Sequence, residues 1–117
     1  MGGYNSAIGS LAYFSGMGNE NISKPDLVAP AVNIYSSKVG GDYDSFSGTS
    51  MASPFVCGSA ALMMEWGIVN GNMPFLYGES LKAYLIKGAD RSNKRNYPDF
   101  GWGYGVLDLR NTFILLE

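Results

Sequence analysis

The sequence predicts a small α/β domain, and three observations lead to this fold class. The chain has 117 residues, of which 46% are hydrophobic, so it is long enough to bury a core. Its 16 glycines and its charged fraction of 15% are typical of a densely packed scaffold with tight turns, and less so of a helical bundle. Short apolar runs separated by Pro and Gly precede two segments with helical spacing. We therefore expect short strands first and helices after them.

The first part of the chain predicts the strands. One strand is expected near residues 11–15, before a polar loop rich in Gly and Asn. The apolar segment 27–35 is interrupted by Pro30, which has no N–H for a sheet ladder and should lie between strand segments or at an edge. A Gly-Gly pair at 40–41, between two segments of strand character, predicts a hairpin.

The second part of the chain predicts the helices. Residues 50–66 are apolar nearly all round, so this helix is expected to be central and buried. Gly67 is expected to end it. Apolar residues then recur at steps of three and four over residues 78–88, which predicts a second, more amphipathic helix. A Gly-rich turn and a short strand follow, and Asp108 is expected to cap a last short helix through Leu115.

Composition and charge argue against several function classes. The net charge is −2, and the basic residues are scattered apart from a short cluster at Arg91, Lys94 and Arg95. A nucleic-acid interface needs a basic face, so we expect no nucleic-acid partner. The longest apolar run, residues 54–66, is broken by polar residues and shorter than a bilayer-spanning helix, so we expect no membrane segment. No charged and then apolar leader opens the sequence, and the single Cys57 allows no intrachain disulfide.

The segment Gly48-Thr49-Ser50-Met51-Ala52-Ser53-Pro54 places a serine at the start of the expected central helix. Backbone N–H groups at a helix N-terminus lack helical partners and carry partial positive charge. The N–H of Ser50 would therefore stabilise an oxyanion formed by attack of its own hydroxyl. Pro54 has no N–H to bond the Ser50 carbonyl, so we expect a distorted first turn.

A serine hydroxyl needs a base within hydrogen-bond reach, and this chain contains no histidine. If Ser50 is a nucleophile, its base must come from outside the chain. A Gly-Thr-Ser triplet taken alone more often marks an ordinary helix start, because Thr and Ser are common N-caps. Both readings can hold together, since the same helix can also serve as core.

The motif at residues 48–54, together with Lys24-Pro25-Asp26-Leu27-Val28-Ala29-Pro30, resembles the nucleophile region of the subtilisin-like serine proteases. The two motifs stand in the order of that family and at about its spacing, and residues 14–15, 58–61 and 103–105 also match. The chain is similar in particular to bacterial subtilases of the clostridial type, including the spore-germination branch. The resemblance implies that residues 1–117 are the C-terminal part of one doubly wound, parallel-sheet catalytic domain, with no separate second domain.

The family resemblance also implies a function and a site. It implies a serine endopeptidase in which Ser50 is the catalytic nucleophile of an acyl-enzyme mechanism. The catalytic His and Asp and the oxyanion Asn of the family lie upstream of the matched region, so the chain alone is expected to be inactive. Thr49 either supports the oxyanion side or only caps the helix. The leaving-group side of the cleft would be lined by Phe14, Phe46, Ser47 and Met51, for whose aromatic members a core role is the alternative.

Departures from the family pattern concern packing. Phe55 replaces a structural His of the family, and Ala31 replaces a Gly, which puts the turn geometry at Ala31 in question.

Other residues with reactive or metal-binding side chains are expected to have structural roles. Cys57 is expected to be an inert small hydrophobe on a buried helix, although its spacing would allow it to share a face with Ser50. Asp26, Asp42, Asp44 and Asp108 do not have the spacing of a calcium loop.

The resemblance implies peptide or protein substrates as partners, and an extracellular, cell-surface or spore-associated location. No cofactor is expected in this segment, and the family implies calcium in the full-length protein. The alternative function is a non-catalytic structural or interaction module, such as a pseudoprotease part or an associating half-domain. A truncated sheet exposes an edge and apolar flanks, so self-association of the fragment is expected.

Overall fold

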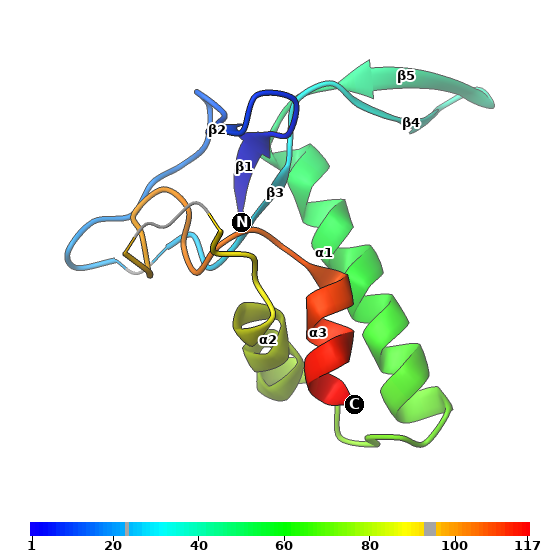
Figure 1. Ribbon diagram of the computed structural model, residues 1–117. Coiled ribbons are helices and arrows are strands. Elements are labelled where there is room, and N and C mark those ends of the chain that lie inside the picture. Colours follow the sequence, from blue (N-terminus) through cyan, green and yellow to red (C-terminus); the bar gives the residue numbers. More distant parts are fainter. Residues whose placement is uncertain (23, 93–95) are drawn as a thin grey trace.

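A computed structural model of the chain describes residues 1–22, 24–92 and 96–117; Lys94 and Arg95 of the basic cluster lie outside these ranges. Strands precede helices, as expected (Figure 1). The strands are β1 (Gly2–Asn5), β2 (Ser10–Leu11), β3 (Val28–Pro30), β4 (Ile34–Lys38) and β5 (Asp42–Phe46). The helices are α1 (Thr49–Met64), the π-helical turn η1 (Glu65–Val69), α2 (Gly78–Lys87) and α3 (Leu109–Leu116).

A small sheet of order β2-β1-β3 forms the base on which α1 rests. β1 pairs in parallel with β3, from Gly2 opposite Val28 to Tyr4 opposite Pro30. Pro30 therefore ends β3, and the expected strand near residues 11–15 is only the two-residue β2, antiparallel to β1. Val28 also forms an isolated parallel bridge with Val106. These parallel pairings and the helices confirm the α/β class.

The hairpin predicted at the Gly-Gly pair is present. β4 and β5 pair antiparallel over five residue pairs, from Ile34 opposite Phe46 to Lys38 opposite Asp42. Gly40 and Gly41 have φ of 96° and 79°, conformations that residues with a side chain rarely adopt. The hairpin projects from the rest of the molecule above the start of α1 (Figure 1).

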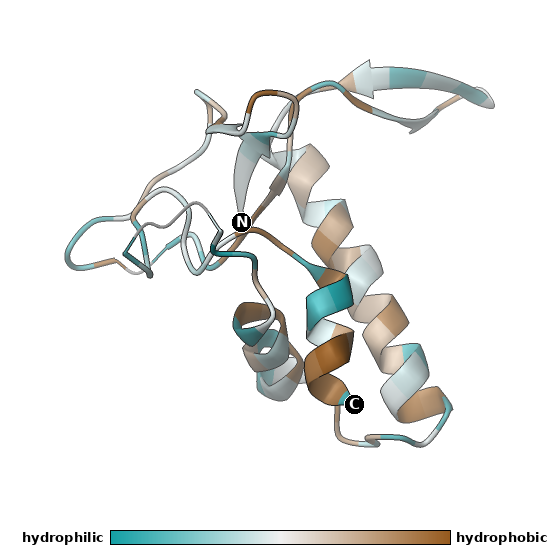
Figure 2. Ribbon diagram, in the orientation of Figure 1, coloured by the Kyte–Doolittle hydropathy of each residue, from teal (hydrophilic) through white to brown (hydrophobic). Residues whose placement is uncertain are grey.

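The long helix is longer and more exposed than the sequence predicted. Gly67 does not end it; the residue is buried within η1, where an added Cβ would lie 2.9 Å from the Met73 carbonyl oxygen. α1 buries only Ala52, Ser59 and Met63, while apolar residues recur along its whole length (Figure 2). The predicted burial all round is therefore not found in this chain, because the sheet and the other helices cover one side of α1.

Together α1 and η1 form a continuous helix of 21 residues, Thr49–Val69. By length and composition alone this helix could cross a membrane, which corrects the expectation that no segment was long enough. The expectation was wrong because the π-helical turn extends the apolar run beyond residue 66. Core helices of soluble proteins have the same length and composition, so this property alone assigns no location.

Two clusters of buried residues hold the elements together. The larger cluster joins α1, α2 and the segment before β3, and consists of Leu27, Met63, Leu76, Leu81, Leu85 and Ala89. The smaller one consists of Ala29, Ala31 and Ala52. Because these three side chains are small, the start of α1 approaches β3 closely. The sheet therefore fixes the position of the segment that contains Ser50.

Candidate functional site

Ser50 is the second residue of α1, and its side chain is exposed. In the described part of the chain, neither its hydroxyl nor its backbone N–H has a hydrogen-bond partner. The first turn carries no acidic residue and no side-chain cap. The site therefore combines a solvent-accessible hydroxyl with an N–H that points out of a helix N-terminus, where the helix dipole favours negative charge.

Gly48 sets the turn that leads into this helix. Its φ is 153°, and its N–H donates to the Ala31 carbonyl oxygen at 2.8 Å. Its own carbonyl oxygen accepts from the Met51 N–H at 2.9 Å. The substitution of Gly by Ala at residue 31, noted in the sequence, keeps this bond, because it uses the main chain. Ala31 is thus a positioning residue that sequence reasoning treated only as a departure.

Thr49 is half-buried and faces the sheet. Its Cγ2 would lie 3.6 Å from a Cβ built on Gly3, and that Cβ would lie only 2.4 Å from the Ala31 Cβ. Gly3 therefore has to be a glycine for β1 to lie against Ala31 and Thr49. No local sequence pattern identified these contacts, because Gly3 is far in sequence from both Ala31 and Thr49 and lies in a strand that the sequence did not predict.

Pro54 lies inside α1, as the sequence indicates, and has no N–H to donate to the Ser50 carbonyl. Ser50 and Pro54 line one open hollow on the helix surface, together with Ser53, Cys57 and Gly58. Cys57 is exposed there, so the expectation that it would be buried is wrong for this chain. Its face is uncovered because nothing in the described chain packs on that side of α1. Cys57 does share a face with Ser50, as its spacing allows.

The four residues expected on the leaving-group side fall into two pairs. Phe14 packs against the alanine cluster and lines a hollow together with Ser47. The Ser47 hydroxyl oxygen accepts from the Asn33 N–H at 2.9 Å. Phe46 and Met51 line a second hollow, between the hairpin and α1. The structure thus brings each pair together in a hollow of its own.

The second sequence motif holds a charged cluster away from Ser50. The Asp26 carboxylate contacts the Lys24 ammonium at 2.7 Å and the Lys82 ammonium at 3.3 Å. Burial alone would raise the pKa of Asp26, but these hydrogen bonds and charges outweigh it and hold the pKa below its ordinary value. The cluster ties the segment before β3 to α2, which is a structural role.

No base for Ser50 and no metal centre is found in the described ranges. No histidine occurs in the sequence, and the described residues contain no group of three or more Cys, Asp or Glu side chains that could hold a metal ion. The arrangement can therefore supply a nucleophile and one oxyanion donor, but not the proton acceptor that a serine needs.

Comparisons with known proteins identify the family to which this chain is similar. The profile of the subtilase family matches residues 1–105. The PII-type proteinase of Lactococcus lactis subsp. cremoris is 48% identical over 109 residues, covering 80% of this chain and 6% of that protein. Subtilisin of Bacillus pumilus is 45% identical over 65 residues, covering 56% of this chain and 22% of its own length.

A solved structure, the CspB protease of Clostridium perfringens, superposes with a TM-score of 0.92 and 48% identity. It covers 98% of this chain, which spans 26% of the CspB chain. This neighbour agrees with the clostridial type indicated by the sequence. The chain thus spans only a small part of the proteins that it matches.

Proposed function

Because this chain belongs to the subtilase family, we propose that it is the C-terminal part of one serine endopeptidase domain and carries the nucleophile, Ser50. The observation that carries the proposal is the exposed Ser50 hydroxyl at the start of α1, beside an unbonded backbone N–H. The fraction of the relatives that the chain spans supports a fragment of a larger domain.

In the complete enzyme, the Ser50 oxygen attacks the carbonyl carbon of the scissile peptide bond. Its proton passes to a base supplied by the rest of the domain, and the Ser50 N–H donates to the oxyanion. The tetrahedral intermediate then expels the amine of the leaving segment, which takes up the proton, and leaves an acyl-enzyme. Water hydrolyses this ester and restores the serine. Thr49 holds the turn that presents the Ser50 N–H against the sheet. The leaving segment is surrounded by Phe14, Phe46, Ser47 and Met51.

A fluorescent serine-directed phosphonate tests the proposal. We expect labelling of the full-length protein and loss of labelling in Ser50→Ala. Ser53 lines the same hollow and serves as the matched control, so labelling should be unchanged in Ser53→Ala. The isolated 117-residue chain should not react, because it has no histidine. Strong, pH-dependent labelling of Ser50 in the isolated chain would contradict the proposed division of the site.

A second candidate function, a non-catalytic interaction module, is favoured by the exposed apolar side chains of α1, such as Phe55 and Leu62. It predicts that the full-length protein binds partners but is not labelled by the phosphonate at Ser50. The same labelling experiment therefore separates the two functions.

A further inference from the structure

The segment that carries Ser50 is tied to the sheet by a series of main-chain hydrogen bonds. The Ala31 N–H donates to the Tyr4 carbonyl oxygen of β1 at 3.0 Å, and the Ala31 carbonyl oxygen accepts from the Gly48 N–H at 2.8 Å. The Gly48 carbonyl oxygen in turn accepts from the Met51 N–H at 2.9 Å. The position of the helix start therefore follows from the position of Ala31.

One side chain adds a bond beside this series. The Ser47 hydroxyl oxygen accepts from the Asn33 N–H at 2.9 Å. In the described part of the chain, it makes the only side-chain hydrogen bond that joins residues 31–33 to residues 47–50. Because both partners lie in this chain, the bond needs no segment from elsewhere in a longer protein. We call this pair of residues the Asn33–Ser47 clasp.

Asn33 has an unusual backbone conformation within the clasp. Its φ is 53°, and among the described residues other than glycine it is the only one with a positive φ. Side chains disfavour this left-handed conformation, which Asn tolerates better than most residues. Such a conformation persists where the surrounding contacts hold it, and residues of this kind are concentrated at functional sites. The bond to Ser47 is one contact that holds Asn33 in place.

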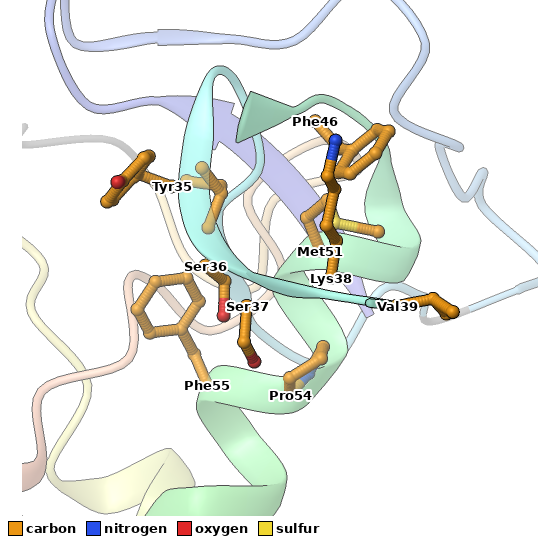
Figure 3. A pocket seen from close by; sticks show the side chains of 10 residues that line it. Tyr35, Ser36, Ser37, Lys38, Val39, Phe46, Met51, Pro54 and Phe55 are labelled. Atoms are coloured by element: carbon orange, nitrogen blue, oxygen red, sulfur yellow. The ribbon is translucent and has the colours of Figure 1, made fainter. Parts of the chain in front are cut away.

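The clasp lies between the hairpin and the turn that leads into α1. Ile34 and Phe46 form the last pair of the β4–β5 ladder at this end, and Asn33 and Ser47 are the residues directly outside that pair. From there β4 crosses the start of α1 (Figure 3). Without the clasp, the turn after the ladder would be tied to the sheet by the main-chain bond of Gly48 alone.

We propose that Ser47 is a positioning residue for the reaction at Ser50 and that it acts through the clasp. The inference rests on the proposed function of Ser50. A nucleophile that is misplaced by about 1 Å can react about 100-fold more slowly, so a reacting serine needs a turn that does not move. The Ser47 hydroxyl fixes this turn three residues before Ser50. Its effect on the reaction then passes through the main chain and requires no contact between the hydroxyl and the substrate.

The maximal rate of phosphonate labelling of the full-length protein tests this role. Ser47→Ala removes the acceptor of the bond. We expect the maximal rate to fall about 3- to 10-fold, as for one lost hydrogen bond, at an unchanged half-maximal phosphonate concentration. Ser47→Thr keeps a hydroxyl at an exposed position and should restore the rate. Ser45→Ala is the matched control, because Ser45 is an exposed serine of β5 outside the clasp, and it should leave the rate unchanged.

The rates are compared without urea, where every variant is folded, so a loss of stability alone would not lower them. An unchanged maximal rate in Ser47→Ala would overturn the proposal. A change confined to the half-maximal concentration would also overturn it, because that result would indicate a direct contact between Ser47 and the ligand.

Asn33 tests the same bond from the donor side. Asn33→Val should lower the maximal labelling rate as Ser47→Ala does, because a β-branched residue is strained at a φ of 53° and would displace the N–H. Asn33→Gly is its matched control: glycine adopts this φ freely and keeps the N–H, so the rate should be unchanged. If both residues act through one bond, the double variant Asn33→Val with Ser47→Ala should be no slower than the slower single variant. Additive losses would contradict the clasp.

Hydrogen exchange separates this inference from the proposed function. In the full-length Ser50→Ala variant, the Asn33 and Gly48 amides should exchange about 3- to 10-fold faster when Ser47→Ala is added, and at the same rate when Ser45→Ala is added. If Ser50 is never labelled but these exchange rates change, the proposed function fails and the fixing of the turn by Ser47 stands. If Ser50 is labelled but neither labelling nor exchange depends on Ser47, the clasp fails and the proposed function stands.

Discussion

Gly48 shows how a single residue sets the position of Ser50. Its φ of 153° is rarely adopted by residues with a side chain, and its N–H bonds the Ala31 carbonyl oxygen. The direction in which α1 leaves the sheet therefore depends on one backbone conformation. No polar side chain caps the helix there, so no side chain occupies the N–H groups at its start.

Gly48→Ala should destabilise the protein by about 1–3 kcal/mol, because an alanine is strained at this φ. Gly71→Ala is the matched control: Gly71 also has a positive φ, of 75°, but lies in an exposed loop far along the chain. Urea unfolding should show a lower free energy of unfolding in both variants. Phosphonate labelling of the full-length protein should be slowed only in Gly48→Ala, and equal labelling would show that the turn does not position Ser50.

Single residues were predicted from the sequence where the rule is local. Asp108 caps α3 as expected, since its carboxylate accepts from the Asn111 N–H at 3.0 Å. Ser50 lies at a helix start for the same reason. The exposure of Cys57 was not predictable in this way, because burial depends on which segments pack against a residue and not on its neighbours in sequence.

Strands and helices, like single residues, were predicted correctly where local sequence determines them. The hairpin and α2 have turn residues and periodicities that act within a few residues, and both were found. β1 was missed because Gly2 and Gly3 have low strand propensity and its pairing with β3 is distant in sequence. The end of the long helix was misplaced because Gly67 serves close packing with the following loop.

The contact between α2 and α3 depends on one glycine. A Cβ on Gly88 would lie 2.7 Å from the Thr112 Cα, and Thr112 is fully buried. Gly88→Ala should therefore destabilise the chain by about 1–3 kcal/mol through overpacking. The control Gly58→Ala places a methyl group in open space on helix α1 and should stabilise it by about 0.5–1 kcal/mol. Urea unfolding followed by tryptophan fluorescence measures both, and a shift in the same direction would refute the packing argument.

The charged cluster at Asp26 predicts a pH dependence. The folded state lowers the pKa of Asp26, so its ionised form stabilises the fold above its ordinary pKa, near 4, and this contribution is lost as the pH falls through the lowered value. Asp26→Asn should cost less than about 1 kcal/mol at pH 7, because the carboxylate is partly exposed. At pH 3 the difference from the unmutated protein should shrink. Urea unfolding at both pH values measures this, and a constant difference would contradict the ion-pair origin.

The whole molecule exposes many large apolar side chains. On the long helix they include Phe55, Leu62, Met64, Ile68 and Val69. Exposed apolar surface of this extent favours association in water. Light scattering of the isolated chain should therefore give a mass above the 12.6 kDa of a monomer. A clean monomer at concentrations of tens of micromolar would count against both a missing half-domain and the interaction-module alternative.

Two hydrogen bonds at the base of the hairpin allow the hairpin sequence to change without moving the residues that follow it. Gly48 N–H bonds Ala31, and Asn33 N–H bonds the Ser47 hydroxyl, so the ends of the segment between Ala31 and Gly48 are fastened together. Changes in hairpin length or composition can then be absorbed beyond this fastening, without moving Ser50. The hairpin is thus an exchangeable module: another hairpin can be grafted in its place while the sheet keeps Ser50 where it is.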